Sequence, residues 1–213
     1  TAKNIYPFLE QAGGMREWVG DRFVKNLSSR KLEVANRDFE ETISVRRNDI
    51  EDDQYGVYAT LVAQMGLNAG KLWQELAAQA MTGSANWLDG SPFFGTTRKY
   101  DGVNAVANTV GTALAEATFN TAYQTMMEYK GHSGKPLGVV PSLLVVGPKL
   151  RATAWNIVKN DFTYSAADKV QTRNVNKDIC DLMVMPELSG AYDDYWFLMD
   201  ARSVLKPVVV QQR

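Results

Sequence analysis

The chain is poor in the side chains on which most enzyme chemistry depends. It has 213 residues but only one cysteine, Cys180, and one histidine, His132. A single cysteine excludes an intrachain disulfide, which fits a reducing compartment. Metal sites and acid–base catalysis commonly use several histidines, so neither is indicated. We expect His132 to be a solvent-exposed turn residue and Cys180 to be a small buried hydrophobe, since it shares strand parity with Leu182 and Val184.

Long apolar runs and an excess of one charge are also missing. No stretch approaches the roughly 18 apolar residues that a transmembrane helix needs, and the N-terminus lacks the pattern of a signal peptide. We therefore expect no membrane partner. The formal charge of −1 excludes a generally basic nucleic-acid-binding protein but leaves room for a local basic surface. A chain of this length can bury a core without disulfides or metals.

Recognisable catalytic and nucleotide-binding motifs are absent as well. Residues 131–135 superficially resemble a phosphate-binding loop, but the spacing is wrong, and Pro136 stands where a Ser or Thr would contact magnesium. The acidic residues at 49–53 lack the alternating spacing and central glycine of a calcium loop. They are better explained as the charged start of a helix. The sequence therefore indicates no enzyme, no catalytic residue, no metal and no cofactor.

Charged residues, by contrast, are concentrated in one stretch. Between Arg16 and Asp53, 18 of the chain's 47 charged residues occupy 38 positions. The same stretch keeps strand-like apolar residues, which are Trp18, Phe23, Val34, Phe39, Ile43 and Val45. A segment this charged cannot form a core layer, so we expect residues 16–48 to form a β-hairpin held away from the body, with its turn at 28–31. In the second strand the apolar parity changes near 36–38, which indicates a bulge or bend.

A long helix is predicted directly after this hairpin, from 55 to 82. Its apolar residues recur at helical spacings and form one stripe, made of Val57, Leu61, Met65, Leu72 and Leu76. Gly83 is the expected C-terminal cap. Gly66 and Gly70 weaken the helix locally, by about 1 kcal/mol each relative to alanine, and we interpret them as positions of close packing against another element.

The remainder of the chain mixes helices and strands. Helices are expected at 113–130 and 149–159, the second with Pro148 at its first position. Strands are expected at 137–146, 179–185, 195–201 and 208–212, with a turn at 189–194. Loops are expected at 1–15, 83–112 and 161–177, and the middle one carries the aromatic anchors Trp87, Phe93, Phe94 and Tyr100.

Five segments resemble the major head subunit family of Mu-like phages. They are REWVG at 16–20 with Arg22, VANRDFEETISVRRNDIEDDQYGVY at 34–58, GKPLGVVPSLLVVGPKLRATA at 134–154, MPEL at 185–188 and YWFLMDARSVLKPVVVQQR at 195–213. The resemblance runs over nearly the whole chain and is weakest at 84–112. It implies an α+β fold, the HK97-like major capsid protein fold, in which the hairpin is the extended loop and the long helix is the spine of the peripheral domain.

The resemblance also implies a division of the chain and a function. The implied units are an N-terminal segment (1–15), the extended loop (16–48), the peripheral domain (49–112), the axial domain (113–185) and C-terminal strands that return to the peripheral domain (186–213). The implied function is a major capsid protein of a tailed double-stranded DNA phage or prophage. Copies would assemble into hexamers and pentamers of an icosahedral shell, in the host cytoplasm, and remain in the virion. Portal, scaffolding and decoration proteins and non-specifically packaged DNA are the implied partners.

We expect the charged hairpin and the acidic residues after it to carry the contacts between copies. The expected contact residues are Trp18, Arg22, Arg30, Lys31, Glu33, Arg37, Glu40, Glu41, Arg46, Arg47, Asp49, Asp52 and Asp53. Exposed ion pairs contribute about 0–1 kcal/mol each, so such charges set register and specificity more than affinity.

Three other interpretations use parts of the same sequence. An encapsulin-like compartment would rely on the same kind of self-association. An enzyme with a non-standard acidic site would use Asp49, Asp52, Asp53, His132 and Cys180. A nucleic-acid-binding module would use Arg22, Lys25, Arg30 and Lys31, although Asp21 and Glu33 interrupt that basic surface. The chain begins at Thr1 without Met, which fits methionine removal, proteolytic maturation or a trimmed chain alike.

Overall fold

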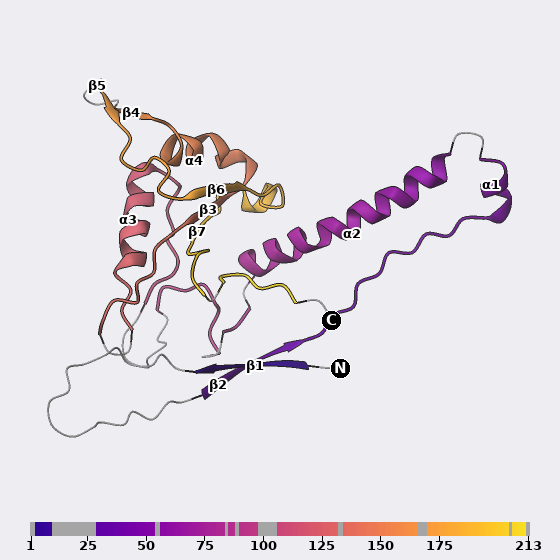
Figure 1. Ribbon diagram of the computed structural model, residues 1–213, viewed down its shortest axis with the longest axis horizontal. Helices are drawn as coiled ribbons and strands as arrows, with labels where there is room; N and C mark the ends of the chain where they lie inside the picture. The colour runs from indigo at the N-terminus through magenta and orange to yellow at the C-terminus, as the bar shows by residue number, and fades with distance from the viewer. Residues whose placement is uncertain are drawn as a thin grey trace.

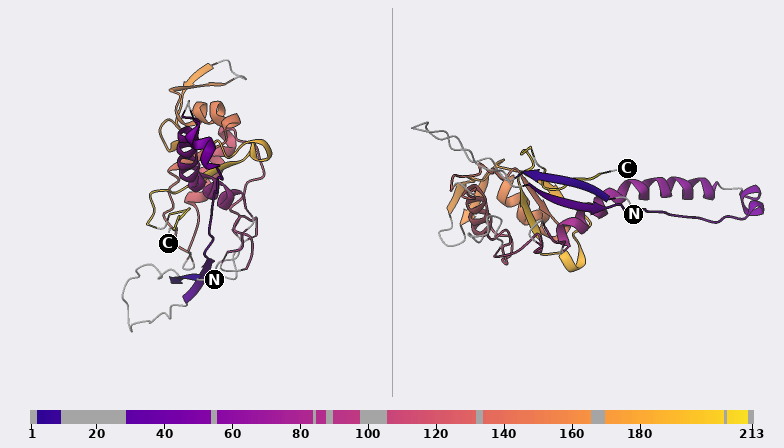
Figure 2. Two further views of the ribbon diagram at one scale, coloured as in Figure 1. Left: turned by 90° about the vertical axis from the view of Figure 1, so that its right-hand side faces the viewer. Right: turned by 90° about the horizontal axis from the view of Figure 1, so that it is seen from below.

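An extended segment of chain runs outward from the rest of the molecule, and a long helix runs back beside it to the body (Figure 1). The computed structural model describes residues 3–9, 29–53, 56–83, 85–87, 90–97, 106–131, 134–165, 170–204 and 206–211. We call residues 36–53 together with the helix up to residue 77 the arm. The described residues from 106 to 204 form the body. The right-hand view of Figure 2 also shows the arm projecting from the body, and in the left-hand view the arm points toward the viewer.

The arm is preceded by a two-stranded antiparallel pair. β1 (Lys3–Leu9) pairs with β2 (Ser29–Ala35), with Lys3 opposite Ala35 and Leu9 opposite Ser29. The predicted loop at 1–15 is therefore wrong for residues 3–9. The predicted turn at 28–31 is also wrong, because Ser29–Lys31 lie inside β2. Polar residues indicated a turn, but they are equally compatible with an exposed strand. The first strand of the predicted hairpin lies outside the described residues.

The chain after β2 is extended but forms no strand. Residues 36–46 are assigned no regular structure, although strand continuation to Val45 was predicted. The predicted change of face near 36–38 coincides with the end of β2 at Ala35. The segment then turns at α1 (Arg47–Glu51), the far end of the arm (Figure 1).

The long helix, α2 (Val57–Thr82), confirms the predicted spine helix to within two residues. Its N-terminus is capped from outside, because the Asp53 carboxylate accepts the backbone N–H groups of Val57 at 3.1 Å and Tyr58 at 3.2 Å. Gly56 has a φ of 66°, which lets the chain turn between Asp53 and the helix. The helix ends at Gly83, as predicted, where the Gly83 N–H donates to the Gln79 carbonyl at 2.8 Å.

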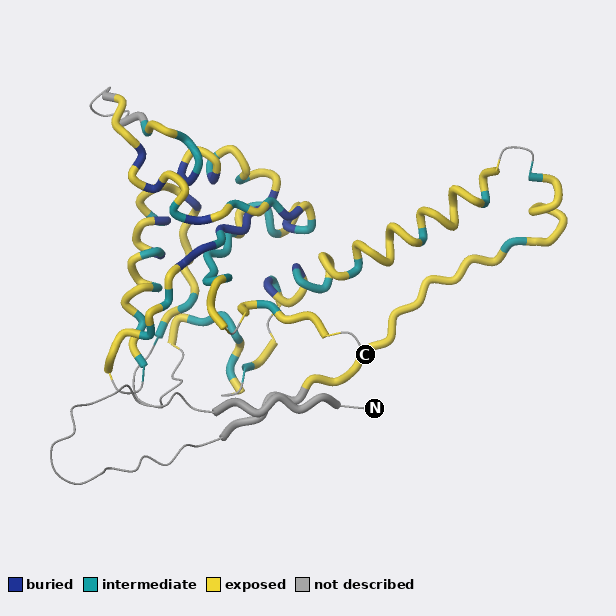
Figure 3. The backbone as a smooth tube through the Cα atoms, viewed as in Figure 1, coloured by how far each residue is buried: buried dark blue, intermediate teal, exposed yellow. Residues whose placement is uncertain are grey.

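The body is organised around a three-stranded sheet. β3 (Leu143–Val146) lies in the middle, parallel to β6 (Asp181–Val184) and antiparallel to β7 (Trp196–Met199). These strands confirm three predicted ones, although the first was expected to begin at residue 137. The buried residues of the chain concentrate at this sheet and the helices beside it (Figure 3).

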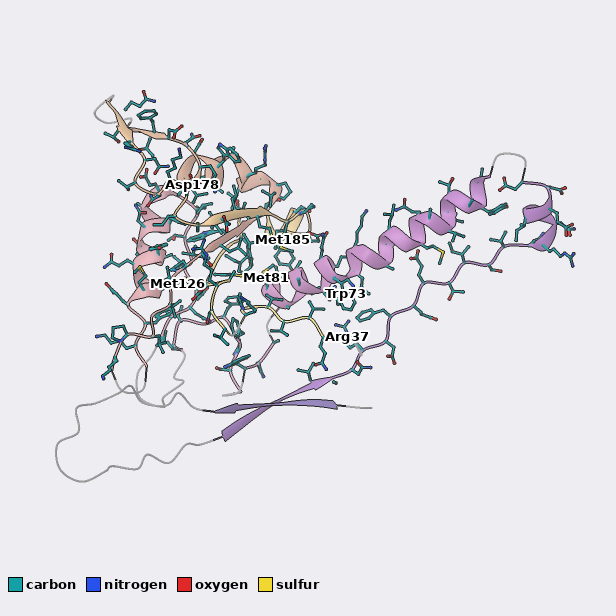
Figure 4. All side chains as sticks on the ribbon, in the orientation of Figure 1. Arg37, Trp73, Met81, Met126, Asp178 and Met185 are labelled. Atoms are coloured by element: carbon teal, nitrogen blue, oxygen red, sulfur yellow. The ribbon has the colours of Figure 1, made fainter. Side chains whose placement is uncertain are left out.

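Alternate residues of β3 point to opposite faces of the sheet and pack into two different apolar clusters. Leu144 and Val146 pack with α3 (Glu116–Met127) and α4 (Arg151–Val158), in a cluster that includes Phe119 and Val158. Val145 belongs to the other cluster, in which the last turns of α2 meet the body. Its buried members are Ala78, Met81, Val145, Met185 and Leu188. Figure 4 shows Met81 and Met185 at this joint, which is the one place where α2 is anchored by buried side chains.

Two parts of the body differ from the sequence prediction. Residues 161–177 were predicted to be a loop but contain an antiparallel hairpin, β4 (Phe162–Ser165) and β5 (Val170–Arg173). Its strands have four residues each, mix polar with apolar side chains and pair through neighbours such as Thr163 and Thr172, whose hydroxyls lie 3.2 Å apart, so no apolar run marks them. The predicted strand at 208–212 is wrong, because residues 208–211 find no strand partner in the described structure. A run of β-branched residues favours a strand but does not by itself provide a neighbouring strand to pair with.

The remaining local predictions agree with the structure where it describes them. The α4 region begins with a 3-10 turn, η1 (Pro148–Leu150), and the turn before β7 contains a second, η2 (Gly190–Tyr192). In the loop after α2, Trp87 stacks edge-on against Phe93 and Phe94 contacts Phe197, so this loop is anchored to β7. Tyr100 and His132 lie outside the described residues.

Cys180 is the buried hydrophobe that its parity predicts, and this makes a pH experiment informative. It is 1% exposed in the cluster that also contains Leu182 and Val184, and burial raises the pKa of its thiol to about 11. The folded state therefore favours the neutral thiol. The corresponding stability is complete below pH about 8.5 and is lost as the pH rises through 11.

We expect the free energy of unfolding in urea to fall more steeply between pH 8.5 and 11 for the natural chain than for Cys180→Ala. Other groups that titrate in this range do so in both proteins, so the difference in slope isolates the thiol. Equal slopes would contradict this account of Cys180.

Candidate assembly surface

The extended segment of the arm lies along α2 but is held there weakly (Figures 1 and 2). Between the described residues of the two, one hydrogen bond is present and it is long: the Asn68 side-chain amide donates to the Glu41 carboxylate at 3.5 Å. Phe39 is 47% exposed and Ile43 is 37% exposed, so neither is buried against the helix. The arm therefore lacks a core of its own.

The stripe predicted on α2 is uncovered at the outer end of the helix and half-buried from Met65 onward. Val57 is 59% exposed and Leu61 is 40% exposed, and the first fully buried side chains of the helix are Ala78 and Met81, next to the body. Burial of apolar surface contributes roughly 25 cal/mol per Å². A projecting helix that leaves this much apolar surface in water gains stability when another molecule covers it.

Gly66 and Gly70 do not pack closely against another described element, so that interpretation is wrong within this chain. A methyl group placed on either one would meet nothing within 4 Å. Both glycines lie on the exposed part of α2, together with Val62 and Leu67, which are 66% and 62% exposed. This apolar surface was not foreseen, because it lies outside the predicted stripe.

The arm is also strongly acidic. Between residues 36 and 53 seven carboxylates stand against three arginines, a net charge of −4, whereas the whole chain carries −1. All of these charged residues are exposed except Asp53, which is half-buried at the start of α2. In an extended chain Asp38 and Glu40 point to the side opposite Glu41, and hence away from α2.

Several predicted contact residues have partners within the arm. Arg47 pairs with Glu51 within α1 at 2.9 Å, and the Arg37 guanidinium lies 5.1 Å from the centre of the Phe39 ring. Asp53 caps α2. Arg30, Lys31 and Glu33 are placed on β2 by their backbone alone, while Trp18 and Arg22 lie outside the described residues.

Within the described ranges, no three or more His, Cys, Asp or Glu side chains are grouped so that they could hold a metal ion. The helices described in the structure include none that is long and apolar enough to span a membrane. The exposed acidic residues and the exposed apolar residues of the arm together form an open surface suited to contact with a macromolecule.

The match to a known family covers most of this chain. Residues 1–113 and 102–188 match the family described as Mu-like prophage major head subunit gpT. The chain belongs to this family. The matched residues include the arm and most of the body, so the surface described above is a feature of a Mu-like head subunit.

Two curated relatives agree with this assignment. The chain is 37% identical over 98 residues to the Mu-like prophage FluMu major head subunit of Haemophilus influenzae, a match that covers 45% of this chain and 32% of the relative. It is 30% identical over 115 residues to the major capsid protein of Escherichia phage Mu, covering 51% of this chain and 38% of that protein. The chain thus spans about a third of the length of the curated relatives it matches.

Solved structures confirm the predicted α+β capsid fold. The bacteriophage JBD30 capsid superimposes with a TM-score of 0.73 at 24% identity, covering 89% of this chain and 87% of that one. The JBD30 capsid decorated with minor capsid protein trimers gives a TM-score of 0.72 over 89% and 86% of the two chains. The JBD30 procapsid gives 0.62 at the same identity, over 88% and 87%. The HK97-like fold expected from the sequence is therefore the fold of this chain.

Proposed function

We propose that this chain is the major head subunit of a tailed double-stranded DNA phage or prophage, and that copies of it associate into the icosahedral shell around the genome. The observation that carries the proposal is the arm, which exposes apolar and acidic surface that no described part of its own body covers. Membership of the major head subunit family supports it, since the relatives are named for that role.

In this proposal the protein works by binding copies of itself and catalyses no reaction. Each arm lies on a neighbouring copy, where its apolar residues lose water and its charges set the register. The contact residues are those expected from the sequence, from Trp18 to Asp53. Shell assembly uses many weak, repeated contacts, so no single charged residue has to contribute more than about 1 kcal/mol.

The finer features follow from the same proposal. The extended loop, peripheral and axial divisions of the chain are as expected from the sequence. Hexamers and pentamers would share one subunit, whose arm can change direction at the joint formed by Met81 and Met185, because methionine side chains repack readily. Portal, scaffolding and decoration proteins would bind the shell, which would form in the host cytoplasm and persist in the virion, with DNA held without sequence specificity.

A pair of matched double variants tests whether the arm drives assembly. In Phe39→Asp/Ile43→Asp two half-exposed apolar residues become charged, and we expect capsomers and larger particles to disappear in sedimentation velocity. The control, Thr42→Asp/Ser44→Asp, adds the same two charges at neighbouring exposed positions and should still assemble. Circular dichroism and melting temperature should stay unchanged in both, because none of these residues is buried.

The outcomes distinguish the proposed role of the arm from the proposed shell function. If the apolar variant assembles as well as its control, the arm's apolar side does not carry the contact. If the natural chain itself forms no assembly in any salt or with its scaffolding partner, the proposed shell function is wrong.

A further inference from the structure

The part of the chain after β7 is the opposite of the arm in charge. From Ala201 onward the sequence contains Arg202, Lys206 and Arg213 but no acidic residue. Arg202 and Lys206 are exposed. Two adjacent valines, Val209 and Val210, are 67% and 52% exposed and belong to a segment whose sequence favours a strand. We call residues 202–211 the basic tail.

The extended segment of the arm and the later part of the basic tail have unpaired backbone. Among the described residues, 36–45 take part in no backbone hydrogen bond, and 206–211 form no strand. At the start of the tail the Asp200 carboxylate accepts the N–H groups of Arg202 and Ser203, and the Lys206 ammonium donates to the Ala201 carbonyl. Unpaired, extended backbone is the usual site at which another strand adds, since each added residue satisfies N–H and C=O groups. Each segment thus has unpaired backbone groups that the other could bond, and the two segments carry opposite charges.

The basic tail is anchored at the joint, away from most of the arm of its own chain. Val208 packs against the apolar cluster that contains Met81. The contact between Glu41 and Asn68 lies 13 residues along α2 from Met81, which is roughly 20 Å at 1.5 Å per residue. The outer part of the arm is therefore uncovered by the described tail of the same chain.

We propose that the basic tail of one copy binds the acidic extended segment, residues 36–46, of a neighbouring copy as an added strand. The inference rests on the proposed shell function and identifies the basic tail as the part of the neighbouring copy that the arm contacts. Asp38 and Glu40, which point away from α2, are the carboxylates that Arg202 and Lys206 meet. In an added strand Val209 points to the face opposite Arg202 and Lys206, and it then lies against the apolar side chains of the receiving arm.

Charge reversal with rescue tests this pairing directly. Variant one, Arg202→Glu/Lys206→Glu, and variant two, Asp38→Lys/Glu40→Lys, each place like charges across the proposed contact. We expect each to raise the protein concentration needed for assembly at least tenfold, as measured by sedimentation. All four substitutions in one chain restore opposite charges and should bring the threshold back to within about threefold of the natural chain.

Two controls show that any loss is specific. All four residues are exposed, so the melting temperature of the unassembled protein should not change. Reversal of another exposed cationic pair, Arg151→Glu/Arg173→Glu, should not be rescued by the arm variant, whatever its own effect on assembly. The rescue, if it occurs, then belongs to the pairing of tail and arm.

Each result has a separate meaning. Loss of assembly in both reversals with recovery in the combined chain supports the pairing. Assembly that survives both reversals, or reversals that the combined chain does not rescue, overturns it and leaves the shell function standing, with another segment or protein on the arm. Failure of the natural chain to assemble removes the proposed function, and this inference with it.

Discussion

Gly147→Ala should leave the body unable to fold stably. Gly147 is buried between β3 and η1, and a Cβ added there would lie 2.0 Å from the Leu188 carbonyl oxygen and 3.1 Å from its carbonyl carbon. These are backbone atoms in the turn after β6, so no side chain can swing aside. Relief requires that the two segments separate, which disturbs the cluster containing Val145 and Met185.

The expected loss exceeds about 4 kcal/mol, out of the roughly 5–15 kcal/mol that stabilise a typical domain. Urea unfolding followed by circular dichroism measures it. The matched control is Gly111→Ala, where an added Cβ meets nothing within 4 Å, and which should change the free energy of unfolding by no more than about 0.5 kcal/mol. A Gly147→Ala protein within 1 kcal/mol of the natural chain would show that the two segments are free to separate.

Asn174→Asp is expected to be the next most damaging change. The Asn174 side-chain amide donates to the carbonyls of Ile157 and Asn160, each at 2.9 Å, at the C-terminal end of α4. Its oxygen accepts the Asn176 N–H at 2.9 Å, and the residue is 5% exposed. An aspartate keeps the acceptor but turns a buried negative charge toward carbonyl oxygens that have lost their donor.

We expect a loss of about 3–5 kcal/mol at pH 7 for Asn174→Asp and about 1–3 kcal/mol for Asn174→Ala. Protonation of the buried carboxyl restores one donor, so the deficit of the aspartate variant should shrink as the pH falls toward 4. Asn156→Asp is the control, because Asn156 is exposed and accepts a bond from Asn160 that an aspartate can keep. The account of Asn174 is wrong if both aspartate variants unfold alike at pH 7.

Where sequence reasoning succeeded, the signal was local. α2 was predicted because its apolar period, its acidic start and its final glycine agree, and the structure places Asp53 and Gly83 in those capping roles. The strands of the body were found because short apolar runs are bounded by turn residues. Charge density alone indicated that something near residues 16–53 leaves the body, and the arm does so.

Where it failed, the missing information was a partner distant in the sequence. β2 pairs with β1, across the 19 residues between Leu9 and Ser29, and nothing in the periodicity of Ser29–Ala35 identifies that partner. β4 and β5 are stabilised by each other and mix polar with apolar side chains, so they look like a loop. Val208–Gln211 has the composition of a strand but no partner within the described chain, which is what a segment that pairs between copies would show.

The same distinction applies to the candidate site. The charged residues of the arm could be named from the sequence, because exposed charges need no tertiary contact to identify them. The apolar part could not, since Val62 and Leu67 fall outside the predicted stripe, and only the structure shows that they and the outer end of the stripe, Val57 and Leu61, are uncovered. Apolar exposure, more than charge, is what makes the arm incomplete in an isolated molecule.

Cryo-electron microscopy of the purified protein, across a range of salt and with its scaffolding partner, tests the central claim most directly. We predict hexameric and pentameric capsomers, tubes or closed shells, in which the density of each arm continues onto a neighbouring copy. A protein that stays monomeric under every condition, or particles in which each arm folds back onto its own body, would contradict the account.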